Sequence, residues 1–296
     1  MNYRKQEVIL AAKRLFMEKG FTATSIQDIL DSSDISKGTF YNYFTSKNEC
    51  LIAILEYGHD EVLIRRRELL SGENPTDKSI LIKQISTRFL VTDEHNLLPI
   101  LQTVFYSDDP ELKALVRNQH LEDLSWLSHR LIDIYGPDIK PYASDCAVMI
   151  HGIMQHMIHA WQASHKEVID IEELITYTIR RIDRIIPDMV HQHDYFLDER
   201  HLFNYNVEKQ GHNLTKKQLL TQLTDIRQQS DSEGMDENQQ YLSFLIEEIQ
   251  AEAPRVFLLE TVIHSFRESF IGTSFDHQAD QIAIDLWEYL DSINNK

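Results

Sequence analysis

The sequence predicts an all-α protein, with an N-terminal three-helix helix-turn-helix domain and a larger helical part behind it. Only 9 glycines and 7 prolines occur among 296 residues, well below the average usage of about 7% and 5%. Leucine, isoleucine, glutamate and glutamine are abundant, and apolar residues recur at helical spacing. Few helix breakers and this periodicity together predict long helices.

The first helix is predicted over residues 4–19, where apolar residues form one stripe and Gly20 supplies a stop. Thr24 or Ser25 begins the second helix, because each is followed three residues later by a residue that completes a capping box. The sequence leaves both starting points open.

A short turn separates the second helix from the third. Ser36 is the predicted cap of the third helix, which ends at Phe44, and Ser46 caps a fourth helix that runs to about Arg67. Since the turn is about four residues long, these elements have the helix-turn-helix pattern.

The rest of the chain is also predicted to be helical. Asp109-Pro110 marks a helix start, Gly136-Pro137 a stop and Pro187 a late break, and the polar run 228–238 is a surface loop. The predicted helices cover residues 77–91, 96–107, 109–135, 141–165, 171–190, 215–229, 236–251, 255–271 and 276–293.

Charge divides the chain into two regions. Residues 1–50 hold seven basic and six acidic residues, a net of +1, whereas the remaining 22 basic and 41 acidic residues give −19. The total of −18 argues against nonspecific nucleic-acid binding, but not against binding through a locally neutral or basic face.

Cysteine usage and hydropathy indicate the compartment. Cys50 and Cys146 share no short spacing, which predicts a reducing setting without disulfides or a cysteine-based zinc site. The apolar run before Lys13 is too short for a signal peptide, and no later segment approaches the roughly 18 apolar residues of a membrane span. We expect a cytoplasmic protein with no membrane partner.

The third predicted helix has two different faces. At 100° per residue, Phe40 and Phe44 point to one side, with Tyr41 at the edge of that side. The opposite side is polar or small and consists of Gly38, Thr39, Asn42 and Tyr43. The two phenylalanines are therefore predicted core residues, while Tyr43 faces outward.

Gly38 on the outward face predicts a close approach to another molecule. Glycine within a helix costs about 1 kcal/mol relative to alanine, and no core packing accounts for it on this side. A DNA major groove needs such access to the helix backbone. Lys37 nearby can donate to phosphates or base edges, and Lys47 opens the fourth helix where a phosphate is favourable. The alternative is an ordinary polar face on a small three-helix core.

Residues 8–51 resemble the N-terminal domain of the TetR (tetracycline repressor-like, TetR/AcrR) family of bacterial transcriptional regulators. Asp34 stands where the family has a turn glycine, and aspartate tolerates the left-handed conformation; Leu30, Ser33 and Cys50 are other mild departures. The matching elements are Gly20-Phe21, Thr24-Ser25-Ile26, Asp28-Ile29, Ile35-Ser36-Lys37-Gly38-Thr39-Phe40-Tyr41, Tyr43-Phe44 and Ser46-Lys47.

The resemblance implies that the third helix enters the major groove. Lys37, Gly38, Thr39 and Asn42 then lie nearest the bases, and Gln27 offers an extra base contact. The residues expected to hold phosphates are Tyr41, Tyr43 and Lys47, with Thr24 or Ser25 at the start of the second helix. The set predicted to bind DNA is Thr24, Ser25, Gln27, Ser36, Lys37, Gly38, Thr39, Tyr41, Asn42, Tyr43 and Lys47.

The resemblance also implies a helical C-terminal domain that binds a small ligand and forms a homodimer through its last two helices, here 141–165 and 171–190. The predicted domains are 1–50, with the fourth helix continuing to about 70, then 51–190 for ligand binding and dimerisation, and 191–296 as an additional helical segment. A two-fold dimer fits a palindromic operator in double-stranded DNA.

Two groups of residues are candidates for binding a small molecule or a metal. Phe105 and Trp126 can line an apolar pocket, and Arg130, His151, Gln155 and His159 can orient a polar group, although aromatic residues at helical spacing are more often core. Histidines in 151–159 and 191–201 permit a metal site, but we favour core or pocket-wall positions. No cofactor is predicted.

The sequence thus predicts a dimeric DNA-binding transcriptional regulator, a repressor that a small molecule releases from its operator. The alternative is an architectural or protein-partner-controlled DNA-binding protein without a small-molecule inducer. No Gly-rich phosphate loop, HExxH or GxSxG motif occurs, so an enzyme is not expected.

Overall fold

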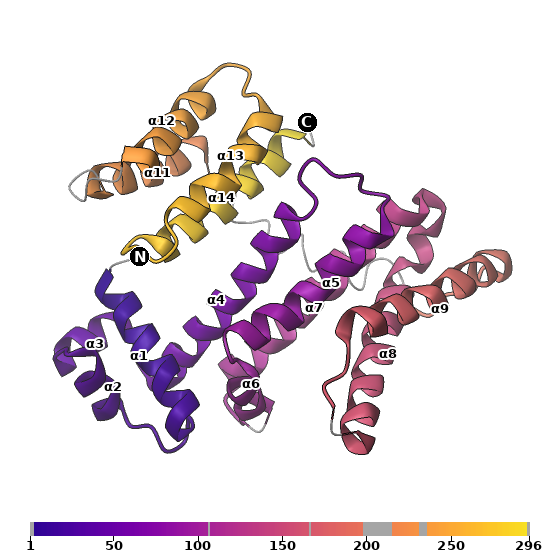
Figure 1. The fold of residues 1–296 in the computed structure, drawn as a ribbon, viewed down its shortest axis with the longest axis horizontal. Helices are drawn as coiled ribbons and strands as arrows, with labels where there is room; N and C mark the ends of the chain where they lie inside the picture. The colour runs from indigo at the N-terminus through magenta and orange to yellow at the C-terminus, as the bar shows by residue number, and fades with distance from the viewer. Residues whose placement is uncertain (1–2, 106, 166, 198–214, 231–235, 295–296) are drawn as a thin grey trace. The chain divides into compact units, whose positions relative to one another are not determined.

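The computed structural model describes residues 3–105, 107–165, 167–197, 215–230 and 236–294, and every regular element in them is a helix (Figure 1). The all-α prediction is confirmed. In chain order the elements are α1 (Tyr3–Lys19), α2 (Ile26–Ser33), α3 (Lys37–Tyr43), α4 (Lys47–Glu68), α5 (Lys78–Glu94), α6 (Leu98–Phe105), α7 (Pro110–Tyr135), the 3₁₀ helix η1 (Pro137–Tyr142), α8 (Ala143–Ser164), α9 (Ile171–Gln192), α11 (Lys216–Ser230), α12 (Asp236–Gln250), α13 (Val256–Ser269) and α14 (Asp276–Asn294).

Several helices begin and end at the predicted local signals. Gly20 and Gly136 have φ angles of 83° and 92°, a region that glycine enters without a Cβ clash, and they follow α1 and α7. Asp109 caps α7 by accepting a hydrogen bond from the backbone N–H of Leu112 at 3.0 Å. These boundaries depend on neighbouring residues, which is why the sequence predicts them.

Two predictions of irregular structure are wrong in extent. α9 continues through Pro187, because Met189 and Val190 in the following turn pack against an apolar core that holds the helix together. The loop predicted over 228–238 is too long, since α11 and α12 include residues at both of its ends.

The chain forms two compact units. The first comprises Met1–Gly72, Thr92–Tyr106 and Asn213–Lys296, and the second comprises Glu73–Val91 and Ser107–His212. The C-terminal helices thus share a unit with the helix-turn-helix region. The functional domain boundaries near residues 50 and 190 stay predictions.

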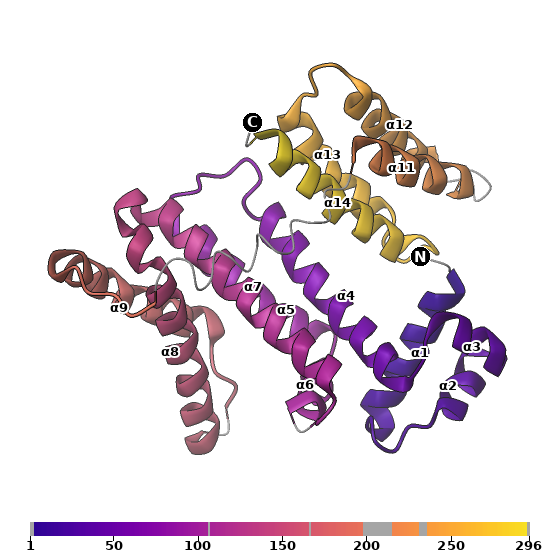
Figure 2. The same cartoon turned by 180° about the vertical axis from the view of Figure 1, so that it is seen from behind.

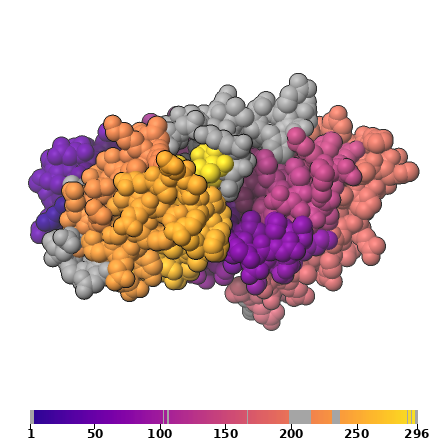
Figure 3. Space-filling model, turned by 90° about the horizontal axis from the view of Figure 1, so that it is seen from above, coloured from indigo at the N-terminus to yellow at the C-terminus, as the bar shows by residue number. Residues whose placement is uncertain are grey.

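In the first unit, α11 to α14 pack each on the next, and α14 returns to α11 (Figure 1 and Figure 2). Figure 3 shows these helices, orange to yellow, as a continuous packed surface. α14 also packs on α4. Fully buried side chains such as Leu223, Ile263, Phe266 and Leu286 form the core, and burial of each contributes about 1.5–3 kcal/mol.

A buried arginine connects α13 to α4 within this unit. Arg267 is only 8% exposed and donates from Nε to Glu68 Oε1 at 2.9 Å and from Nη1 to Glu61 Oε2 at 3.1 Å. Its Nη1 also lies 3.6 Å from Asp280 Oδ1 of α14. This charge cluster therefore fixes the C-terminal helices to the helix that follows the helix-turn-helix.

The second unit has its own core, built by α7, η1, α8, α9 and the part of α5 that belongs to it. Leu131, Ala147, Ile150, Ile175 and Ile182 are buried there. Because the apolar residues of α9 recur every three or four positions, one side of this helix is buried and the other carries charges.

Candidate nucleic-acid interface

α2 begins with a complete capping box. Ser25 Oγ accepts the backbone N–H of Asp28 at 3.1 Å, and Asp28 Oδ2 accepts the backbone N–H of Ser25 at 2.8 Å. The pKa of Asp28 is lowered, mainly by the hydrogen bond from Lys19 and further by those from Ser25. Of the two starting points that the sequence allowed, the structure thus has Ser25 as the cap.

The turn between α2 and α3 depends on two polar residues. Asp34 adopts the left-handed conformation, with φ 50° and ψ 48°, in place of the glycine that the resemblance leads one to expect. Ser36 then caps α3 by accepting the backbone N–H of Thr39 at 3.1 Å. Together they start α3 directly after α2.

The inward face of α3 is apolar, as predicted. Phe40 and Phe44 are 0% and 1% exposed, with their ring centroids 5.7 Å apart. Lys5 of α1 lies over the Phe44 ring at 5.1 Å, where a cation interacts favourably with the aromatic face. These anchors fix the rotation of α3 and hence the direction of its opposite face.

The outward face of α3 is polar and accessible. Lys37, Gly38, Tyr41 and Asn42 are exposed, and Tyr43 is half-buried. A Cβ built on Gly38 meets only Ser36 Oγ at 3.8 Å, which is ordinary van der Waals contact. Among the residues that the structure describes, nothing therefore requires glycine at this position.

Lys47 and Thr24 have partners inside the protein. Lys47 Nζ donates to the carbonyl oxygens of Phe21 and Thr24 at 2.7 and 2.6 Å, and burial lowers the pKa of Lys47. Thr24 is 1% exposed and its hydroxyl donates to Gly20 O at 2.8 Å. Both side chains hold the segment before α2, so a phosphate contact by the Thr24 hydroxyl does not fit this arrangement.

Other residues of the predicted DNA-binding set form local hydrogen bonds. Gln27 Nε2 donates to Asp31 Oδ1 at 2.7 Å, and the hydroxyls of Ser36 and Thr39 lie 2.9 Å apart. Since these bonds are on the surface, exchanging them for DNA contacts costs little net hydrogen-bond energy.

The predicted ligand residues are distributed over different environments of the protein. The Phe105 side chain lies outside the described structure, and Trp126 is half-buried against the core of the second unit. Arg130 is buried and donates to Gln84 Oε1 at 2.9 Å and Asp133 Oδ2 at 2.7 Å. Its contacts are those of a structural network.

The remaining three predicted ligand residues are on α8. His151 lies 3.9 Å from Asp123 Oδ2, whereas Gln155 and His159 are exposed. Within the described residues, no group of three or more His, Cys, Asp or Glu side chains is placed to hold a metal ion. Asp198 and His201 of the second histidine cluster lie outside the described residues.

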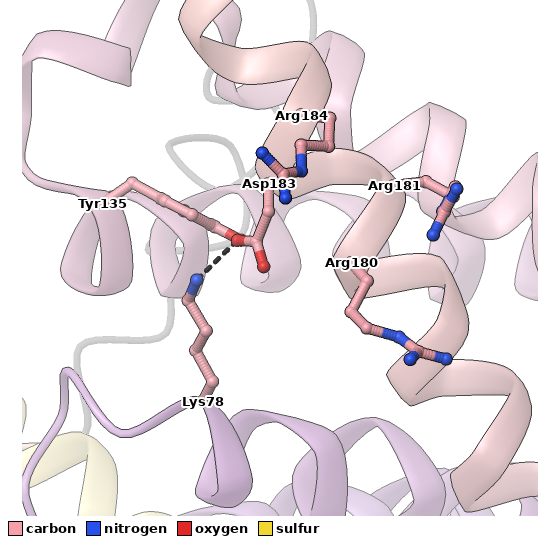
Figure 4. A pocket seen from close by; sticks show the side chains of 6 residues that line it. All are labelled: Lys78, Tyr135, Arg180, Arg181, Asp183 and Arg184. Atoms are coloured by element: carbon pink, nitrogen blue, oxygen red, sulfur yellow. Dashed lines mark hydrogen bonds and ion pairs between the residues drawn. The ribbon is translucent and has the colours of Figure 1, made fainter.

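A polar cavity of about 500 Å³ was not predicted from the sequence. The residues around it come from three helices of the second unit and carry mostly positive charge (Figure 4). Its sequence signal is the spacing of three arginines on α9, but the other members are far away in the chain. The lining residues are Lys78, Tyr135, Arg180, Arg181, Asp183 and Arg184.

Among the described helices, none has both the length and the apolar character required to cross a membrane.

Known proteins resemble this chain in its N-terminal region and, for one relative, over most of its length. Residues 8–54 match the family model of bacterial regulatory proteins, tetR family. The chain is 29% identical over 194 residues to the uncharacterized HTH-type transcriptional regulator YerO of Bacillus subtilis (strain 168), which covers 64% of this chain and 66% of that one. It is 26% identical over 278 residues to the uncharacterized HTH-type transcriptional regulator YuxN of the same strain, covering 91% and 94%. With the HTH-type transcriptional repressor KstR2 of Mycobacterium tuberculosis (strain CDC 1551 / Oshkosh), it shares 30% identity over 143 residues, 47% of this chain and 68% of the repressor.

Proposed function

This chain belongs to the tetR family of bacterial regulatory proteins, and from that premise we propose that it is a dimeric repressor, released from a palindromic operator by a small molecule. Its relatives are HTH-type transcriptional regulators, so the chain is a DNA-binding transcription regulator and not an enzyme. The proposal adds the contact residues, the dimer and the ligand, and places the protein in the cytoplasm with the bacterial chromosome.

The observation that carries the proposal is the open backbone of α3 at Gly38. A surface glycine in a helix lowers helix stability, and here neither a positive φ nor a close neighbour compensates for this cost. Lys37 and Asn42 flank it on an accessible face. In the proposed complex the groove floor approaches Gly38, Asn42 hydrogen-bonds a base edge and Lys37 contacts a phosphate or a base.

The proposed dimer forms through α8 and α9. Large apolar side chains are partly exposed on both helices, with Val148 at 39%, Met157 at 44% and Tyr177 at 39%. Contact with a second copy removes such surface from water. A two-fold axis then presents two α3 helices to two half-sites of one operator.

Selection from a library of randomised DNA duplexes tests this function. We expect the purified protein to enrich a sequence with two inverted half-sites, and light scattering of the free protein to give twice the mass of the chain. Enrichment of an asymmetric site by a monomer contradicts the dimer, and enrichment of no sequence contradicts specific DNA binding.

A further inference from the structure

The polar cavity of the second unit has a strong excess of positive charge. Four basic side chains and one carboxylate line it, so the lining has a formal charge of +3. The whole chain, in contrast, has a net charge of −18. Lys78 comes from α5, Tyr135 from the end of α7 and the others from α9. Because all of these residues belong to one compact unit, the cavity does not depend on how the two units are placed.

The carboxylate of the cavity is already neutralised. Figure 4 shows Lys78 extending toward Asp183, with which it forms an ion pair, and the Tyr135 hydroxyl donates to Asp183 Oδ1 at 2.7 Å. Burial alone raises the pKa of Asp183, but the hydrogen bonds from Lys78 and Tyr135 outweigh it, so this pKa is lowered. Asp183 therefore stays ionised, and its single negative charge, which Lys78 and Arg184 both lie near, offsets only one of the four positive charges around the cavity.

The arginines of α9 are available to an external group. Arg180 and Arg184 are one turn apart and exposed, and within the described residues neither forms a hydrogen bond or an ion pair. Arg181 lies over the ring of Tyr177 at 4.9 Å, a residue of the proposed dimer contact, so Arg181 is not part of the proposed anion contact. A guanidinium offers paired N–H donors that match phosphate and carboxylate oxygens.

We propose that this cavity binds a small polyanion, a molecule with a phosphate group or with at least two carboxylates, through Arg180 and Arg184. The volume of about 500 Å³ lies in the range of small-molecule sites. A concave lining of charged groups fits such a molecule and disfavours an apolar one, which leaves these groups without hydrogen-bond partners. In this inference the cavity is the binding site for the small molecule that releases the repressor, and to that extent the inference rests on the proposed function.

Isothermal titration with inorganic phosphate and with citrate, in chloride buffers of one ionic strength, tests the site on the full chain without DNA. We expect the protein to bind at least one of the two, and the variant Arg180→Gln/Arg184→Gln to bind it at least tenfold more weakly. Arg117→Gln is the control, because Arg117 is an exposed arginine of the same unit and lies outside the cavity. The anion affinity of this variant should stay within twofold of that of the parent.

The outcomes separate this site from the proposed function. No binding by the parent, or equal binding by all three proteins, overturns the polyanion site even where operator selection succeeds. If the double variant becomes monomeric but binds the anion with unchanged affinity, the two arginines contact the second protomer, and this result also overturns the polyanion site. If the protein binds the anion but selects no operator sequence, the polyanion site is supported and only the repressor function is contradicted. Comparing phosphate with citrate distinguishes a phosphate ligand from a polycarboxylate.

Discussion

Replacing Arg267 by alanine should lower the free energy of unfolding of the first unit by about 3–5 kcal/mol, the range measured when one partner of a buried ion pair is removed. Arg267 is 8% exposed and binds Glu68 through two nitrogens, at 2.9 and 3.1 Å. Two of the carboxylates keep another contact, Glu61 with Arg65 at 2.6 Å and Glu68 with His264 Nδ1 at 3.1 Å, so Asp280 is the carboxylate most affected by the loss. Urea unfolding followed by circular dichroism at pH 8 measures it.

The loss should be smaller at lower pH. Burial, followed by the nearby charge of Glu61, raises the pKa of Asp280 to about 7, above the value of about 3.9 in an unfolded chain. A carboxyl with a raised folded-state pKa stabilises the fold most below its unfolded pKa, and this contribution is lost as pH rises through 7. At pH 6 more Asp280 is neutral, and less unpaired charge remains after Arg267 is removed.

Arg255→Ala is the control for this prediction. Arg255 also bonds a carboxylate, Glu248, at 3.1 Å; the arginine side chain is 63% exposed and Glu248 is 6% exposed. After the substitution Glu248 keeps the backbone N–H of residue 255 as a donor at 2.6 Å, and solvent already screens the lost guanidinium, so a smaller change in stability is expected. If the two alanine variants unfold at the same urea concentration, the buried cluster does not hold the C-terminal helices on α4.

Replacing Gly38 by leucine should weaken operator binding about 100-fold, equivalent to about 2.8 kcal/mol, without destabilising the protein. The added side chain lies on the outward face of α3 and fills the space that the proposed groove contact needs. Within the protein that space is open, and leucine favours a helix over glycine. Fluorescence anisotropy with the selected operator measures binding, and a thermal melt measures stability.

A second variant separates this effect from that of an added apolar group. Gln228→Leu places the same side chain on an exposed position of α11 in the same unit and should keep parental affinity. A Gly38→Leu protein that binds as the parent does removes α3 from the groove. A Gly38→Leu protein that melts earlier indicates that the glycine serves the fold instead.

Helix boundaries could be predicted where the cause is local. Asp109 and Gly136 act on their immediate neighbours, and the capping box of Ser25 is completed only three residues away. The break expected at Pro187 is absent, because Met189 in the following turn packs against residues distant in the sequence and keeps α9 intact. Such tertiary contacts override a local preference.

In the candidate site, too, the sequence predicts features with a local cause but not contacts between distant residues. The division of α3 into a buried and an accessible face follows from helical geometry, so Phe40 and Gly38 were placed correctly. The carbonyl partners of Lys47 are 26 and 23 residues away, and no short-range pattern indicates them. The polar cavity joins Lys78 to α9 over 105 residues, which explains why the sequence alone did not predict it.

Repeating the duplex selection with Asn42→Ala tests most directly whether α3 reads DNA. Asn42 is exposed on the outward face, and a good bidentate contact discriminates against a wrong base by about 1–3 kcal/mol. We predict that the variant enriches the parental sequence with one position in each half-site relaxed, at symmetric places. If the variant and the parent enrich identical sequences with identical preference at every position, Asn42 does not read a base and the assignment of this face of α3 to the groove is contradicted.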